Sequence, residues 1–169
     1  MKKALRLLII AAALTASQLG SSIPTHAMGT TNFGLGAIFG EPTGISAKYF
    51  LDGEHRMAID AAMTYSFFEY FMGYGDFLYQ FPGLFPKGDE QLQKIALYLG
   101  VGGGIRIASK DNPKAGDARA NAFARFPFGA EWLNPDPALG VFLEIAPGLG
   151  FAPKVFGMFQ GGLGIRYYF

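Results

Sequence analysis

The sequence predicts an all-β fold: a transmembrane antiparallel up-and-down β-barrel of eight strands. Three observations lead to this prediction. The first residues have the pattern of an export signal, the remainder alternates large apolar residues with small or polar ones, and turn sequences separate the alternating segments. Half of the 169 residues are hydrophobic, yet beyond the N-terminal segment no uncharged apolar run reaches the ~18 residues of a transmembrane helix. Strands therefore have to hold the apolar residues.

The N-terminal segment has the parts of a secretory signal peptide. Positive charges precede a short apolar run at 7–14, and the small and polar residues that follow end in Thr-His-Ala at 25–27. The alternative is a retained N-terminal anchor, but the run is shorter than the roughly 20 residues that span a bilayer. We expect cleavage after Ala27, so that 1–27 is a signal peptide and 28–169 is a single barrel domain. The chain has no cysteine, which excludes lipoprotein processing and disulfides.

Three alternating segments come first. The segment 32–40 sets Phe and Leu against Gly, and Glu-Pro-Thr-Gly at 41–44 forms a tight turn because Pro presets φ and Gly relaxes the exit. The segment 45–51 sets Ile, Tyr and Leu against Ser and Lys. After an Asp-Gly-Glu turn at 52–54, the segment 56–67 sets Met, Ile, Tyr and Phe against Asp, Thr and Ser.

The middle of the chain is less regular. A fourth strand is expected at 75–81, with Phe and Tyr outward and Asp and Gln inward, and 68–74 is then an outer loop. Two prolines interrupt 82–93, which becomes a long periplasmic connection. The fifth segment, 95–107, is clear, because Ile, Leu and Val alternate with Gly, Tyr and Arg over its whole length.

A polar outer loop at 109–121 leads to the last three segments. The segment 122–133 sets Ala, Phe and Trp against Arg, Pro, Gly and Glu, and Asn-Pro-Asp-Pro at 134–137 is a strong turn. The segments 139–151 and 156–169 again place Leu, Ile and Phe on one face and Gly with single charges on the other.

The two faces of these segments distinguish a membrane barrel from a soluble β-sandwich. Every charge within a strand lies opposite the face with the large apolar residues. The outer face of a soluble sandwich would be rich in Lys, Glu and Thr, whereas the second face here is Gly, Ala, Tyr and a few charges, which suits a narrow lumen. Segments of ~9–14 residues are also close to the ~9–11 residues that cross a bilayer at a tilt.

The last six residues carry a resemblance to a known class. Gly-Ile-Arg-Tyr-Tyr-Phe resembles the terminal signal of bacterial outer-membrane barrels, in which Gly164, Tyr167 and Phe169 match the glycine and the two aromatic positions. Gly162 departs from the polar residue often found there. In size and architecture, about 30–169 is similar to the membrane domain of outer membrane protein A, to outer membrane protein X and to outer membrane protein W. The resemblance implies an outer-membrane location, contact with phospholipid and lipopolysaccharide, and assembly by the barrel assembly machinery.

The inward charges of the strands are the candidate site. They number four cations and four carboxylates: Lys48, Asp60, Asp76, Arg106, Arg125, Glu131, Glu144 and Arg166. The turns place Lys48 nearly opposite Asp60, and Glu144 diagonal to Arg125. The structural interpretation is a network of salt bridges that fills the lumen, because an unpaired charge in a narrow barrel is costly. The alternative interpretation is a proton or ion path.

Other features of the sequence predict little chemistry. A net charge of +1 with no basic block outside the signal argues against nucleic acid, and the glycines at 100–104 lack the spacing and the helix of a nucleotide-binding loop. Outside the signal, His55 is the one histidine and lies in a turn, so we expect no enzyme, no metal and no cofactor. The apolar run 67–72 is expected to be an interfacial loop, or else a contact surface for another membrane protein or a second copy. Aromatic residues near the strand ends are expected to form interface girdles: Tyr65, Phe67, Tyr79, Trp132, Tyr167 and Phe169.

Three functions are compatible with this sequence. The first is a closed structural or interaction barrel that binds a partner through its outer loops or its lipid-facing wall. The second is a narrow conduit for ions or small apolar molecules, similar to outer membrane protein W. The third, a lipid-modifying enzyme, lacks a histidine in a suitable place. Paired charges in the lumen favour the first function, and a continuous gap lined by Gly and Tyr would favour the second.

Overall fold

The computed structural model describes residues 32–67, 70–85, 88–108, 120–135, 138–153 and 155–169. The predicted signal peptide lies outside these residues, as does most of the predicted 109–121 loop. The strands are β1 (Phe33–Glu41), β2 (Thr43–Phe50), β3 (Met57–Ser66), β4 (Tyr70–Phe81), β5 (Ile95–Ala108), β6 (Ala120–Arg125), β7 (Phe128–Pro135), β8 (Ala138–Ala152) and β9 (Phe156–Tyr168), and the short helix α2 spans Glu90–Gln93.

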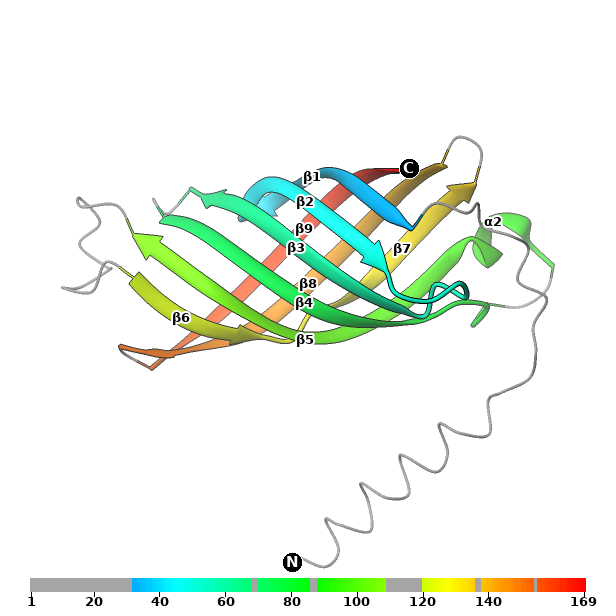
Figure 1. Cartoon of the computed structure of the whole chain (residues 1–169). Helices are drawn as coiled ribbons and strands as arrows, with labels where there is room; N and C mark the ends of the chain where they lie inside the picture. The colour runs from blue at the N-terminus through cyan, green and yellow to red at the C-terminus, as the bar shows by residue number, and fades with distance from the viewer. Residues whose placement is uncertain (1–31, 68–69, 86–87, 109–119, 136–137, 154) are drawn as a thin grey trace, which may run out of the picture.

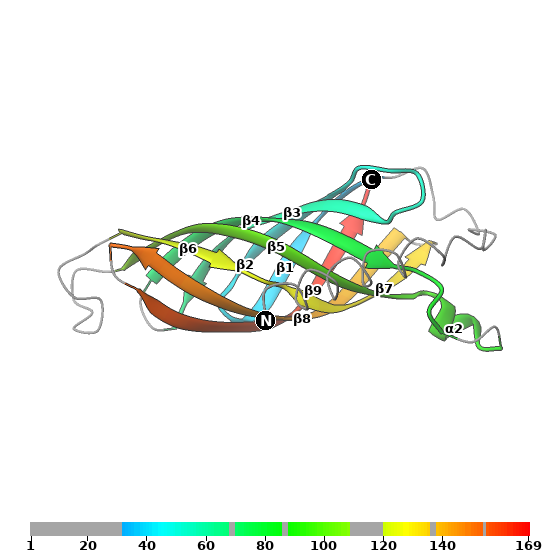
Figure 2. The ribbon, with the colours of Figure 1, turned by 90° about the horizontal axis from the view of Figure 1, so that it is seen from below.

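The strands form one antiparallel sheet that closes on itself (Figures 1 and 2). Apart from β6 and β7, each strand pairs with the next along the chain, and β1 pairs with β9 from Gly34 opposite Tyr168 to Glu41 opposite Gly161. The strands β6 and β7 both lie between β5 and β8, so together they form one interrupted strand of an eight-stranded barrel. This confirms the predicted fold class and the closed barrel.

The interruption between β6 and β7 has a local cause. Pro127 lies in the wall and has no N–H group, so it cannot continue the ladder. The wall stays closed because the Phe126 N–H donates to the Pro147 carbonyl at 2.9 Å and the Gly100 N–H donates to the Pro127 carbonyl at 2.7 Å.

The predicted division into an apolar outer face and a polar inner face is confirmed along the strands. In β3 exposed and buried residues alternate without exception: Ile59 and Met63 are exposed on the outer wall, whereas Asp60 and Thr64 are buried inside. A barrel that faced water would have the reverse arrangement of apolar side chains.

The predicted strand boundaries are wrong in two places. The fourth strand begins at Tyr70 instead of 75, so most of 68–74 is strand and not an outer loop. The face rule fails in this stretch because its large residues, Tyr70, Met72 and Tyr74, point inward, and Gly73 takes an outward position. The sixth strand likewise begins at Ala120, which shortens the predicted loop.

The ends of the barrel differ (Figure 1). The C-terminus, the β2–β3 turn and α2 gather at one end, here called the C-terminal end; the tight turn between β1 and β2 lies at the opposite end. The predicted long connection at 82–93 includes α2, whose first turn is capped by the Asp89 side chain accepting from the Gln91 N–H at 2.9 Å. Among the described residues, no helix is long and apolar enough to cross a membrane.

Candidate functional site in the barrel lumen

The lumen is filled in layers. A cluster at the C-terminal end contains Phe50, Ala58, Leu78, Tyr98, Leu133 and Tyr168. A second cluster, toward the opposite end, contains Ala62, Met72, Tyr74 and Phe123. Buried carboxylates lie between the two: along β3, Asp60 stands between Ala58 and Ala62, and along β4, Asp76 stands between Leu78 and Tyr74. Ionic side chains are therefore enclosed from both ends by apolar and aromatic ones.

Inward glycines make room for the aromatic rings of these layers. A Cβ atom at Gly34 would lie 2.6 Å from the Tyr168 ring, and one at Gly129 would lie 2.7 Å from the Tyr98 hydroxyl. At Gly164, it would lie 2.1 Å from the Phe142 ring. The glycine-rich inner face thus reflects close packing of rings against the wall, and larger residues at these positions would displace them.

The structure places the eight predicted lumen charges inside the barrel but does not join all of them. Seven are buried, each no more than 4% exposed: Lys48, Asp60, Asp76, Arg125, Glu131, Glu144 and Arg166. The eighth, Arg106, is half-buried. Among the described residues its guanidinium contacts two rings, Tyr70 at 5.0 Å and Phe156 at 4.3 Å, and forms no ion pair.

Glu131 is the centre of the first ion-pair group. The Lys48 ammonium group forms an ion pair with Glu131, and both side chains are inaccessible to water. Glu131 also accepts from Gln80 Nε2 at 3.1 Å and from the Tyr168 hydroxyl at 2.6 Å. Lys48 does lie opposite Asp60 in the β2–β3 register, as expected, but its long side chain reaches across the lumen to β7 instead.

Arg166 joins β9 to β2 and β3. Its Nη2 lies 2.5 Å from Asp60 Oδ2, and its Nε and Nη2 donate to the Ser46 hydroxyl at 2.9 and 2.6 Å. The guanidinium plane also stacks over the Phe142 ring at 3.8 Å. A planar cation with several donors suits this position because it spans a narrow space and keeps its geometry.

Arg125 forms the third group. It makes an ion pair with Glu144, whose other oxygen accepts from the Tyr98 hydroxyl at 2.9 Å. Its Nε lies 3.3 Å from Asp76 Oδ2, and the Tyr74 ring lies 3.8 Å from its guanidinium carbon. Arg125 and Glu144, expected to be diagonal neighbours from the 134–137 turn, are thus in contact, but the expected register is wrong, because Glu144 pairs with Gly129 and Arg125 with Gly148.

Two further polar residues lie at the ends of the lumen, and the sequence did not predict this position for either of them. Glu41 accepts from the Tyr70 hydroxyl at 2.8 Å and from Ser66, which ties the β1–β2 turn to β3 and β4. At the C-terminal end, His55 is buried in the β2–β3 turn with φ of 53°, and its ring stacks on Phe50 at 4.2 Å. Burial lowers the pKa of His55 below its usual value.

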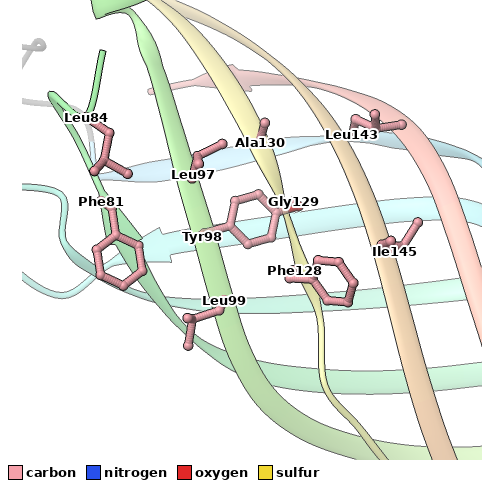
Figure 3. A pocket seen from close by; sticks show the side chains of 10 residues that line it. All are labelled: Phe81, Leu84, Leu97, Tyr98, Leu99, Phe128, Gly129, Ala130, Leu143 and Ile145. Carbon is pink, nitrogen blue, oxygen red and sulfur yellow. The ribbon is translucent and has the colours of Figure 1, made fainter. Parts of the chain in front are cut away.

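The outer wall carries an apolar hollow near the C-terminal end (Figure 3). Its volume is about 610 Å³, and residues of β4, β5, β7 and β8 line it together with Leu84 of the β4–β5 connection. The run 67–72, predicted to be an interfacial loop, belongs to β4 from Tyr70 onward. Phe67 and Phe71 face outward, but Met72 points into the lumen and belongs to β4.

Comparisons with known proteins support the fold. The structure is similar to the N-terminal β-barrel domain of Pseudomonas aeruginosa OprF, with a TM-score of 0.59 and 16% sequence identity, over 82% of this chain and 98% of that one. No protein-family model and no curated protein matches the sequence. At this identity the likeness is one of fold.

Within the described residues, no group of three or more His, Asp or Glu side chains is arranged to hold a metal ion.

Proposed function

We propose that this chain is an integral barrel of a bacterial outer membrane, with a lumen closed by paired charges, and that it acts as a structural or interaction protein through its outer loops or its lipid-facing wall. The observation that carries the proposal is the lumen network: each of its side chains in an ion pair is at most 5% exposed to water.

The outer wall supports the membrane location. Large apolar side chains cover it on both sides of the closure, such as Ile45 and Met63 on one side and Leu143 and Leu163 on the other. The predicted girdle residues divide between the ends: Tyr65 and Phe67 lie near the end with the β1–β2 turn, and Tyr79, Trp132, Tyr167 and Phe169 lie near the C-terminal end. A barrel with an apolar band between two aromatic rows is suited to phospholipid and lipopolysaccharide.

Burial of the network supports a closed lumen. A water-filled passage would leave these side chains accessible to water, yet the Lys48–Glu131 pair has no accessible surface. An ion crossing the lumen would first have to separate such a pair and leave both of its charges desolvated and unpaired, which is unfavourable. The aromatic and apolar layers at both ends add a second barrier, because they offer an ion few ligands.

Conductance in planar bilayers tests the closed lumen. We expect wild-type protein to show little or no steady conductance. Glu144→Ala should increase leakage for two reasons. Asp76, 3.3 Å from Arg125 Nε, is then the one carboxylate among the described residues that Arg125 still approaches, and the Tyr98 hydroxyl loses the oxygen to which it donates. Glu54→Ala is the matched control, since Glu54 pairs with Arg56 in the exposed β2–β3 turn. Stable and reproducible wild-type channels would refute the closed lumen and favour the narrow conduit.

A further inference from the structure

The buried network contains more carboxylates than cations. Among the described residues, its cations are Lys48, Arg125 and Arg166, and its carboxylates are Asp60, Asp76, Glu131 and Glu144. Arg106 does not balance the count. It lies opposite Met72, four positions from Asp76 along β4, or about 13 Å at the usual rise of a strand, and it contacts rings instead. With every group ionised, the network would hold one uncompensated negative charge.

Hydrogen bonding identifies the extra carboxylate as Asp76. Glu131, Asp60 and Glu144 each accept a hydrogen bond from a cation of the network. Asp76 approaches Arg125 Nε at 3.3 Å, but neither of its oxygens takes part in a hydrogen bond, although both are buried. Its Oδ1 lies against the backbone of β5, where a Cβ atom at Gly102 would be 2.0 Å away.

Asp76 also faces a second carboxylate. It is the register partner of Asp60 across the β3–β4 ladder, and Asp60 Oδ1 is likewise buried and without a hydrogen bond. Like charges directly opposite each other on adjacent strands destabilise a sheet. Protonation of one of the two groups removes that repulsion and converts an acceptor-only group into a donor, for which Asp60 Oδ1 is a free acceptor.

We propose that Asp76 holds a proton in the folded barrel at neutral pH, which makes it a proton-binding site in the middle of the lumen. The proton balances the network at three cations and three carboxylates. The charged and titratable groups facing this position are Asp60 of β3, Tyr74 of β4, Arg125 of β6, Glu144 of β8 and Arg166 of β9. Arg125 is shared with Glu144, so no cation of the network belongs to Asp76 alone.

Infrared spectroscopy of the whole barrel, in micelles of a detergent that has no ester or carboxyl group, tests the proposal, because phospholipid esters absorb where a protonated carboxylic acid does. Wild-type protein at neutral pH should show the carbonyl stretching band of a protonated carboxylic acid, and Asp76→Asn should abolish it. Glu54→Gln, at the exposed turn, is the matched control and should retain the band. Absence of the band from wild-type protein, or its persistence in Asp76→Asn, would overturn the proposal.

Thermal stability gives a second, independent readout. Asp76→Asn replaces a neutral carboxyl group by a neutral amide of the same shape, so its Tm at neutral pH should equal or exceed that of the wild type. Glu144→Gln removes an ionised partner of Arg125 and should lower the Tm. An equal loss in both variants would show that Asp76 is an ionised partner as well. If the carboxylic acid band is absent and the Tm differs between sodium and potassium buffers, a bound cation balances the charge of the network in place of a proton. That result would also overturn the proposal. Neither readout depends on conductance, so this inference and the proposed function can fail separately.

Discussion

Glu131→Gln perturbs the lumen network at its most connected residue. The substitution keeps the shape of the side chain and leaves one acceptor oxygen, which can keep the hydrogen bond from Gln80 or the one from Tyr168, because these donors reach different oxygens of Glu131. It removes the charge that pairs with Lys48, whose ammonium group has no exposure to water. The other carboxylate near Lys48 is its register partner Asp60, but Arg166 already binds that group at 2.5 Å. Lys48 is therefore left as an unpaired buried cation.

The expected loss follows from this burial. Removing one partner of a buried ion pair costs about 3–5 kcal/mol, because the remaining charge stays desolvated. For a chain of this length, a loss of that size lowers the Tm by roughly 6–20 °C. The exposed pair between Glu54 and Arg56, 2.8 Å apart, is the matched control, and Glu54→Gln should cost about 0–1 kcal/mol.

Urea unfolding of the barrel in lipid vesicles, followed through the fluorescence of the single tryptophan, Trp132, measures both losses. Adding Lys48→Met to Glu131→Gln should recover part of the stability, since the double variant buries neither charge. The reasoning is refuted if Glu131→Gln costs no more than Glu54→Gln, or if the effects of the two lumen substitutions simply add.

Two further predictions concern the C-terminus and the β2–β3 turn. The Phe169 side chain is exposed and makes ring contacts with Phe33 and Tyr167, so the Phe169→Asp variant should still fold in detergent. In cells the variant should fail to assemble in the outer membrane and should leave periplasmic chain or degradation products. Unchanged outer-membrane levels would show that the C-terminal pattern is incidental. Because burial lowers the pKa of His55, the folded barrel favours the neutral imidazole. The stability gained in this way is complete at a pH above the pKa of an unfolded histidine, and it is lost as the pH falls through the lower pKa of the folded state. Thermal stability should therefore decrease between about pH 7 and pH 5, and His55→Asn, a residue that tolerates the positive φ, should weaken this dependence; a nuclear magnetic resonance titration of His55 with a midpoint above 6.5 would contradict the prediction.

Most of the fold could be predicted because a barrel wall imposes a period of two on the sequence. A large apolar residue faces lipid and a small or charged one faces the lumen, so the alternation within each strand predicts which of its residues face outward and which face inward. The start of β4 is the exception, because the large side chains there point inward. At the start of β4, Tyr70, Met72 and Tyr74 fill the lumen while Gly73 and Gly75 lie on the outer wall, which inverts the usual sizes and conceals the strand.

The partners of the lumen charges could be predicted only where the two residues lie on neighbouring strands of the wall. Glu144 and Arg125 lie on the paired strands β8 and β6 and are in contact, although the register pairs Arg125 with Gly148 and Glu144 with Gly129. Lys48 and Glu131 meet across the lumen from β2 and β7, which no ladder connects. Such a pair depends on the barrel radius and on side-chain length. The same limit applies to His55, whose burial follows from the path of a turn and leaves no periodic signal.

The central claim is that this barrel crosses a membrane with its apolar wall in lipid and its charges inside, and spin labelling tests it most directly. The chain has no cysteine, so single cysteines can be labelled at Met63 and Leu163 on opposite parts of the outer wall and at Ala62 on the inner face. In lipid vesicles, labels at 63 and 163 should collide with molecular oxygen, which concentrates in the bilayer, and not with a water-soluble nickel chelate. The label at 62 should be shielded from both. Stronger collision of the 63 and 163 labels with the nickel chelate than with oxygen would contradict the account, because it would place the apolar wall in water.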